Sequence, residues 1–168
     1  ARACAALTHD HIVAVHQVSP GADGEPPHLV MEFIAGGSLH DRIRGERRAD
    51  MQQCVEWIRQ AATALQAAHD AGIVHRDVKP SNLLIDMKTQ RLRVADFGLA
   101  RLVESEESLT AEGMIAGTPA YMSPEQVVNP TGVTGLTDTY SLGVVLYEAL
   151  TGELPFRGTV RMVLNQVL

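Results

Sequence analysis

The strongest restriction on the fold of this chain comes from two short polar motifs held at a fixed separation. Residues 75–82 read His-Arg-Asp-Val-Lys-Pro-Ser-Asn, and residues 96–98 read Asp-Phe-Gly. Between them, two short and mostly apolar runs split by a polar turn predict a β-hairpin over residues 83–94. A hairpin of this length places Asn82 and Asp96 at neighbouring strand ends. The fold therefore has to bring the side chains of the two motifs together.

These motifs offer a carboxylate, an ammonium and an amide on one loop and a second carboxylate on the next, which suits phosphoryl transfer to a hydroxyl. Either motif alone fits an ordinary turn or a polar surface run. Together they resemble the catalytic core of a protein kinase. Three more segments follow the order of that family and resemble the inter-lobe hinge, the end of the activation segment and the central buried helix: residues 29–39, 117–125 and 138–148.

The resemblance implies a role for each polar side chain of the motifs. Asp77 is expected to orient the acceptor hydroxyl and take its proton, and Lys79 to offset charge on the transferring phosphoryl group. Asn82 and Asp96 provide hard oxygen ligands for Mg²⁺. Thr118 resembles the threonine that contacts the catalytic Asp and Lys, and with Lys79 it favours the serine/threonine class of the family.

The same resemblance implies an ATP site at the hinge. The adenine is expected to meet the backbone carbonyl of Glu32 and the amide and carbonyl of Ile34, with Leu84 as an apolar floor and Met31 behind the pocket. Ser38 has two interpretations, a contact to the ribose or a cap for the following helix, and the capping role is preferred.

Two structural supports follow from the family pattern. Asp138 is expected to brace the catalytic loop from beneath, and Phe97 to pack under His75. Arg76 precedes the catalytic Asp, and kinases with this Arg are commonly controlled by phosphorylation in the activation segment. The candidate acceptors, in an acidic stretch with Arg101 nearby, are Ser105, Ser108 and Thr110. The alternative is an ordinary loop whose hydroxyls stay unmodified.

The resemblance covers all 168 residues but only the middle of a kinase domain. We therefore expect a truncated α+β, two-lobed, protein-kinase-like fold, with residues 1–31 as a small-lobe remnant (the end of a helix and following strands). Residues 32–37 form the hinge and residues 38–168 the large lobe, incomplete at its C-terminal end. The family's Gly-rich phosphate loop, strand Lys and helix Glu have no counterpart in the sequence. The segment alone is therefore expected to be inactive.

Local patterns predict three helices independently. The longest runs from Met51, capped by Asp50 with Gln53 completing a capping box, and ends at Gly72. A short helix starts at Ser123-Pro124, and another begins near Asp138 and ends at Gly152. The apolar spacing of the first helix predicts one buried face: Val55, Ile58, Ala62, Leu65 and Ala68.

Composition excludes several classes of protein. Hydrophobic residues make up 45% of the chain, enough for one core and against disorder. The net charge of −6, with few aromatic residues, makes nucleic acid an unexpected partner. Cys4 and Cys54 are expected to be buried reduced thiols, and His9, His11 and His16 structural or surface residues rather than a metal cluster.

The predicted function is that of an ATP-dependent serine/threonine protein kinase, similar to bacterial kinases of eukaryotic type, acting on Ser and Thr of protein substrates. No apolar run is long enough to span a bilayer, so no membrane contact is expected from this segment. The kinase resemblance implies a cytoplasmic domain, and membrane anchoring elsewhere in the parent protein stays open. Two alternatives remain: a pseudokinase or nucleotide-binding regulatory scaffold, and a small-molecule kinase of related fold. The segment 117–125, which resembles a substrate-docking loop, favours a protein substrate.

Overall fold

The computed structural model describes residues 7–19, 21, 26–45, 49–97 and 119–168. Its described strands are β1 (Val15–Ser19), β2 (His28–Met31), β3 (Gly36–Ser38), β4 (Leu83–Asp86) and β5 (Leu92–Val94). Its described α-helices are α1 (Leu39–Arg44), α2 (Met51–Asp70), α4 (Pro124–Val128), α5 (Gly135–Thr151) and α6 (Val160–Val167). Two 3₁₀ turns, η2 (Pro80–Asn82) and η3 (Pro119–Tyr121), complete the order.

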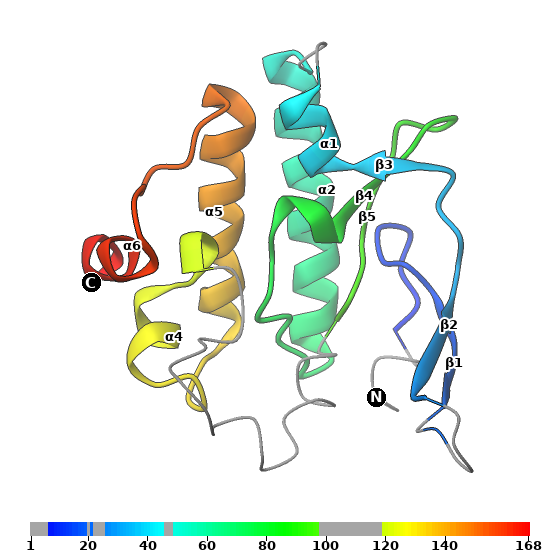
Figure 1. Cartoon of the computed structure of the whole chain (residues 1–168). Helices are drawn as coiled ribbons and strands as arrows, with labels where there is room; N and C mark the ends of the chain where they lie inside the picture. Colours follow the sequence, from blue (N-terminus) through cyan, green and yellow to red (C-terminus); the bar gives the residue numbers. More distant parts are fainter. Residues whose placement is uncertain (1–6, 20, 22–25, 46–48, 98–118) are drawn as a thin grey trace.

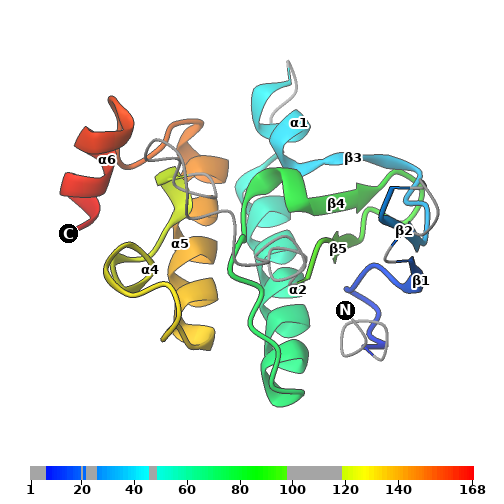
Figure 2. The same cartoon turned by 60° about the horizontal axis from the view of Figure 1, so that its bottom comes forward.

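The elements lie in layers, with α2 between α5 on one side and β4 and β5 on the other (Figures 1 and 2). β1 and β2 form a separate two-stranded antiparallel sheet. The segment before β1 runs beside β5. The amide of Val13 donates to the carbonyl of Val94 at 2.9 Å, and the amide of Val94 donates to His11 at 2.8 Å. This pairing ties the first described residues to the strand that leads into Asp96.

The second sheet has the order β3-β4-β5, all antiparallel, and contains the predicted hairpin. Leu84 faces Arg93 across the hairpin, and the amide of Ala95 donates to the carbonyl of Asn82 at 2.9 Å. β3 falls partly inside the segment that was expected to be hinge. Gly36 is needed in it because an added Cβ would lie 1.9 Å from the carbonyl oxygen of Ile85.

Helix α2 confirms the predicted helix and part of its predicted buried face, since Leu65 and Ala68 are buried, but the N-terminal half of that face is wrong. Val55 is 51% exposed and Ala62 is exposed, and Ile58 is only partly buried. In the first half of the helix the buried residues lie about one position before the predicted ones, and the full buried set is Cys54, Trp57, Gln60, Ala61, Ala64, Leu65 and Ala68. Both sets of residues fit a helical period. The buried set contains the large Trp57 ring and the small alanines, which let α5 and β5 pack closely against α2.

The cap of α2 at Asp50 and its end at Gly72 are as predicted, but the cap of this helix lacks the Gln53 half of the predicted capping box. The Asp50 carboxylate accepts from the amide of Gln53 at 2.8 Å, and Gly72 closes α2 at a φ of 74°. Ser38 caps α1 in a capping box with Asp41, which is the preferred of its two predicted roles. Helix α5 begins at Gly135, three residues before Asp138, because Thr134 supplies the cap.

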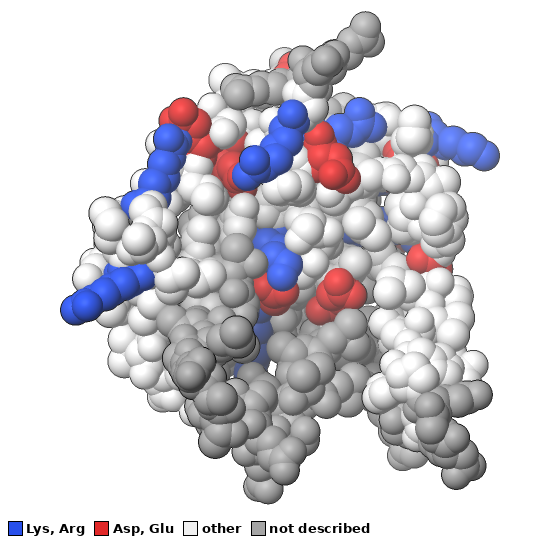
Figure 3. Space-filling model, in the orientation of Figure 1, with Lys and Arg blue, Asp and Glu red and all other residues white. Residues whose placement is uncertain are grey.

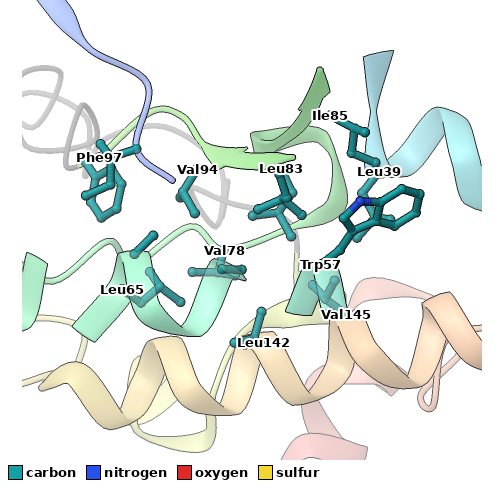
Figure 4. Close-up of a cluster of buried hydrophobic side chains, with 14 of the residues drawn as sticks. Leu39, Trp57, Leu65, Val78, Leu83, Ile85, Val94, Phe97, Leu142 and Val145 are labelled. Atoms are coloured by element: carbon teal, nitrogen blue, oxygen red, sulfur yellow. The ribbon is translucent and has the colours of Figure 1, made fainter. Parts of the chain in front are cut away.

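The core is one cluster of apolar side chains shared by α2, α5, β4 and β5. Figure 4 shows Leu83, Val78, Leu65 and Val145 converging from the different elements on a common interior. Cys54 is buried there as a free thiol, and burial raises its pKa, so the thiol form is favoured. Cys4 lies outside the described residues.

Among the helices that the structure describes, none is long and apolar enough to cross a bilayer.

Candidate active site

The loop of residues 75–82 is anchored from beneath by one buried carboxylate on α5. Asp138 is fully buried, and its two oxygens accept the amides of His75 at 2.9 Å and Arg76 at 2.8 Å. The ring of His69, at the end of α2, donates its Nε2–H to the same group at 2.7 Å. These three donors satisfy a charge that would otherwise be costly to bury, and the contacts agree with the expected bracing role.

Three polar side chains of the loop meet at one point. The Nζ of Lys79 lies 2.6 Å from Oδ2 of Asp77, and the amide nitrogen of Asn82 donates to the carbonyl oxygen of Asp77 at 2.8 Å. A longer contact of 3.2 Å joins the same nitrogen to Asp77 Oδ2. Both side chains of the ion pair are partly exposed, Lys79 by 24% and Asp77 by 35%. The carboxylate is thus fixed in position and open to an incoming group.

The second carboxylate is placed by the hairpin and by His75. The ring of His75 donates its Nε2–H to the carbonyl of Ala95 at 2.8 Å and accepts the amide of Asp77 at its Nδ1 at 3.2 Å. Burial lowers the pKa of His75, which keeps the ring neutral and able to do both. Phe97 packs against it with ring centroids 4.7 Å apart, as expected. Asp96 follows Ala95 with a φ of 63°, an uncommon backbone for a residue other than glycine.

The segment expected to bind adenine joins the two sheets. Met31 ends β2, and the amide of Glu32 donates to the carbonyl of Ala14 at 2.8 Å. After Ile34 the chain runs beside β4, where the amide of Met87 donates to the carbonyl of Ala35 at 3.0 Å. Leu84, in the middle of β4, is only partly buried.

Several predicted residues lie outside the described part of the chain. They are Thr118, Arg101 and the candidate phosphorylation sites Ser105, Ser108 and Thr110. Two of the histidines make structural hydrogen bonds. The ring of His9 accepts the amide of His11 at 3.1 Å, and the His11 ring donates to the carbonyl of Leu92 at 2.9 Å.

Sequence reasoning missed three contacts around the site. Arg93 pairs at 2.6 Å with the carboxylate of Glu32, the first residue of the predicted hinge. The Gln126 side chain reaches the carbonyl of Arg76. The Tyr121 hydroxyl donates to the buried Glu148 carboxylate at 2.6 Å. Sequence spacing gives no signal for these pairs, because their partners are 27 or more positions apart.

The Tyr121–Glu148 pair lies beside a cavity of about 310 Å³ lined by Ile43, Arg44, Gly45, Glu148 and Gly152. Burial and the neighbouring Glu148 raise the pKa of Tyr121, so the phenol stays protonated.

On the face seen in Figure 3, basic and acidic side chains of the described residues are interspersed, and neither sign forms a patch of its own.

Comparison with known proteins places the chain in a family. The protein kinase domain model matches residues 1–167, so the chain belongs to the protein kinase domain family. It is 42% identical over 160 residues to the serine/threonine-protein kinase PknB of Mycobacterium leprae, covering 94% of this chain and 25% of that protein. It is 45% identical over 158 residues to PknL of Mycobacterium tuberculosis, covering 94% of this chain and 38% of the relative.

A solved structure gives the same result for the fold. A crystal structure of Rad53 1–466 in complex with AMP-PNP superposes with a TM-score of 0.77 and 31% identity, over 98% of this chain and 41% of that chain. These matches confirm the predicted kinase resemblance and the α+β kinase-like fold. The chain spans about a quarter of the length of the PknB relatives.

Proposed function

We propose that the protein carrying this chain is an ATP-dependent serine/threonine protein kinase that transfers the γ-phosphate of ATP to hydroxyls of protein substrates. The observation that carries the proposal is the cluster of Asp77, Lys79 and Asn82 on a loop fixed by Asp138. The names of the mycobacterial relatives support the same activity.

In this proposal Asp77 is the general base. Its carboxylate is held by the amide of Asn82 and by Lys79, so it can accept the proton of a Ser or Thr hydroxyl in one orientation. The ammonium of Lys79 lies close enough to turn from Asp77 toward a phosphoryl group and offset its charge. Thr118, carried over from the family pattern, is proposed to contact both.

Asn82 and Asp96 fit a magnesium site of the kind that nucleotide phosphates complete. The amide nitrogen of Asn82 is bonded to Asp77, which fixes the side chain so that its oxygen is the atom suited to a metal. Asp96 lies at the adjoining strand end. Mg²⁺ takes few protein oxygens and keeps water and phosphate ligands, and when bound it would neutralise charge on the β- and γ-phosphates.

For ATP itself we propose the hinge backbone at Glu32 and Ile34, with Leu84 below the adenine and Met31 behind it. The run of the chain from β2 past Ile34 onto β3 and β4 supports this placement. The Rad53 structure with AMP-PNP supports nucleotide binding by this fold.

The first test is Asp77→Asn in the full-length protein, assayed for phosphate transfer from ATP to a Ser/Thr substrate. Loss of the general base should lower the rate by at least about 10²-fold. Asp70→Asn is the control, because Asp70 is an exposed carboxylate at the end of α2. If wild type and Asp77→Asn both bind ATP and neither turns it over, the regulatory-scaffold alternative holds instead.

The metal assignment has a separate test. Calorimetry should find that Mg²⁺ binds weakly to the nucleotide-free protein and firmly with ATP present, because the protein offers only two or three oxygens. Asp96→Asn should weaken binding of Mg²⁺-ATP but leave binding of adenosine unchanged, since adenosine has no phosphates. Tight Mg²⁺ binding without nucleotide would contradict the assignment.

A further inference from the structure

Gln126, the third residue of α4, has both ends of its side-chain amide engaged. Its oxygen accepts the amide of Ser123 at 3.1 Å, which is half of the capping box of α4. Its nitrogen donates to the carbonyl oxygen of Arg76 at 2.8 Å, fifty positions earlier in the chain. The orientation of the amide follows from its partners, because one is a donor and the other an acceptor. Capping alone uses only the oxygen.

The residue that receives this bond has an unfavourable backbone. Arg76 has a φ of 69°, in the left-handed region that residues other than glycine rarely adopt. Its amide donates to Asp138 on α5, and its carbonyl accepts from Gln126 on α4. The backbone amide and carbonyl of Arg76 are therefore held by different helices. The peptide between Arg76 and Asp77 is held at its carbonyl by Gln126 and at its amide by the His75 ring.

We propose that Gln126 is a positioning residue for Asp77. By holding the carbonyl of Arg76, its amide nitrogen sets the orientation of the peptide that carries the Asp77 side chain. It also makes a direct link between α4 and the catalytic loop. The effect on turnover rests on the proposed kinase function, whereas the effect on the loop itself does not.

The discriminating variant is Gln126→Glu. A carboxylate keeps an acceptor for the amide of Ser123, so the cap is retained, but it presents an acceptor where Arg76 needs a donor. The matched control is Gln166→Glu on α6. The side-chain amide of Gln166 also has both ends engaged, with the backbone amide and carbonyl of Arg157, far from the loop along the chain.

Two readouts are measured on the full-length protein. Hydrogen exchange of the peptide covering residues 73–79 should be faster in Gln126→Glu than in wild type and unchanged in Gln166→Glu. The kcat for phosphate transfer should fall about tenfold or more in Gln126→Glu, since small misplacements of a catalytic group are costly. The KM for ATP should change less than kcat and stay within about twofold, because the proposed adenine contacts come from the hinge and Leu84, which the bond to Arg76 does not involve.

Each outcome decides the proposal. Wild-type exchange in residues 73–79 together with wild-type kcat in Gln126→Glu would overturn it and leave Gln126 as a helix cap only. Faster exchange with an unchanged kcat would also overturn the positioning role. If the wild type has no turnover, the proposed function fails, and the exchange comparison still tests the link to Arg76. Should Gln126→Glu fold poorly, Gln126→Met is measured in the same way. It removes the donor to Arg76 without adding a charge but also removes the acceptor for the Ser123 amide, so exchange in residues 73–79 is then the deciding readout.

Discussion

Asp138 illustrates how single side chains set the geometry of the site. A carboxylate with no solvent exposure is unfavourable unless donors surround it, and here the donors are two loop amides and the His69 ring. The same bonds that satisfy the charge fix residues 75 and 76. Stability and loop geometry therefore depend on one group.

We expect Asp138→Ala to lower the free energy of unfolding by about 2–4 kcal/mol, because buried amides lose their acceptor. Urea unfolding followed by Trp57 fluorescence measures this. Asp70→Ala, which removes an exposed carboxylate bonded to Gln66, should change stability by less than about 0.5 kcal/mol. A similar loss in both variants would show that Asp138 has no special structural role.

At the scale of elements, helix α5 shows how local chemistry sets limits that packing then uses. Thr134 caps its start, and Gly152, at a φ of 77°, ends it by donating to the carbonyl of Glu148 at 2.7 Å. Gly143 lies in the middle of the same helix, where an added Cβ would meet nothing within 4 Å. Gly152 therefore occupies a left-handed backbone conformation that favours glycine, whereas Gly143 is an ordinary helical position.

We expect opposite effects from the same substitution at these two glycines. Gly152→Ala should destabilise the protein by about 1 kcal/mol because alanine is strained at positive φ. Gly143→Ala should stabilise it by about 0.5–1 kcal/mol because alanine loses less backbone entropy in a helix. Thermal unfolding of the two variants beside wild type gives the comparison, and a loss of stability at Gly143 would contradict the open space seen there.

At the scale of the whole molecule, α2 lies between α5 and the β4–β5 hairpin and packs against both. Trp57 is 2% exposed and donates its indole N–H to the carbonyl of Gln90 at 2.9 Å, and Gln60 accepts the amide of Leu92 at 2.7 Å. The hairpin that ends at Asn82 and Asp96 is therefore attached to the helix that leads into the catalytic loop. One layer positions both halves of the site.

We expect Trp57→Ala to cost about 3–5 kcal/mol, through the cavity and the lost hydrogen bond. Val55→Ala, on the exposed side of α2, should cost less than about 0.5 kcal/mol. Circular dichroism during urea unfolding suits both, since it does not rely on the indole. Equal costs would argue for the buried face that the sequence alone predicted.

Much of the fold was predictable because it depends on near neighbours along the chain. The hairpin, the cap at Asp50, the helix start at Ser123 and the stop at Gly152 all follow from residues within a few positions of one another. The site motifs were predictable in the same way, and the family match confirms the resemblance on which the kinase interpretation depends.

The sequence alone therefore determined the order of the elements, the caps at Asp50 and Ser123, the helix end at Gly152 and the motifs that carry the family resemblance, since these depend on short-range spacing. Only the tertiary structure decided which stripe of α2 is buried and which distant groups meet. Val55 and Trp57 both fit a helical period, and only the approach of α5 and β5 separates them. The bond from Gln126 to Arg76 joins positions fifty apart, and no local rule reaches that far. Long-range contacts are set by how whole elements pack, and that arrangement exists only in three dimensions.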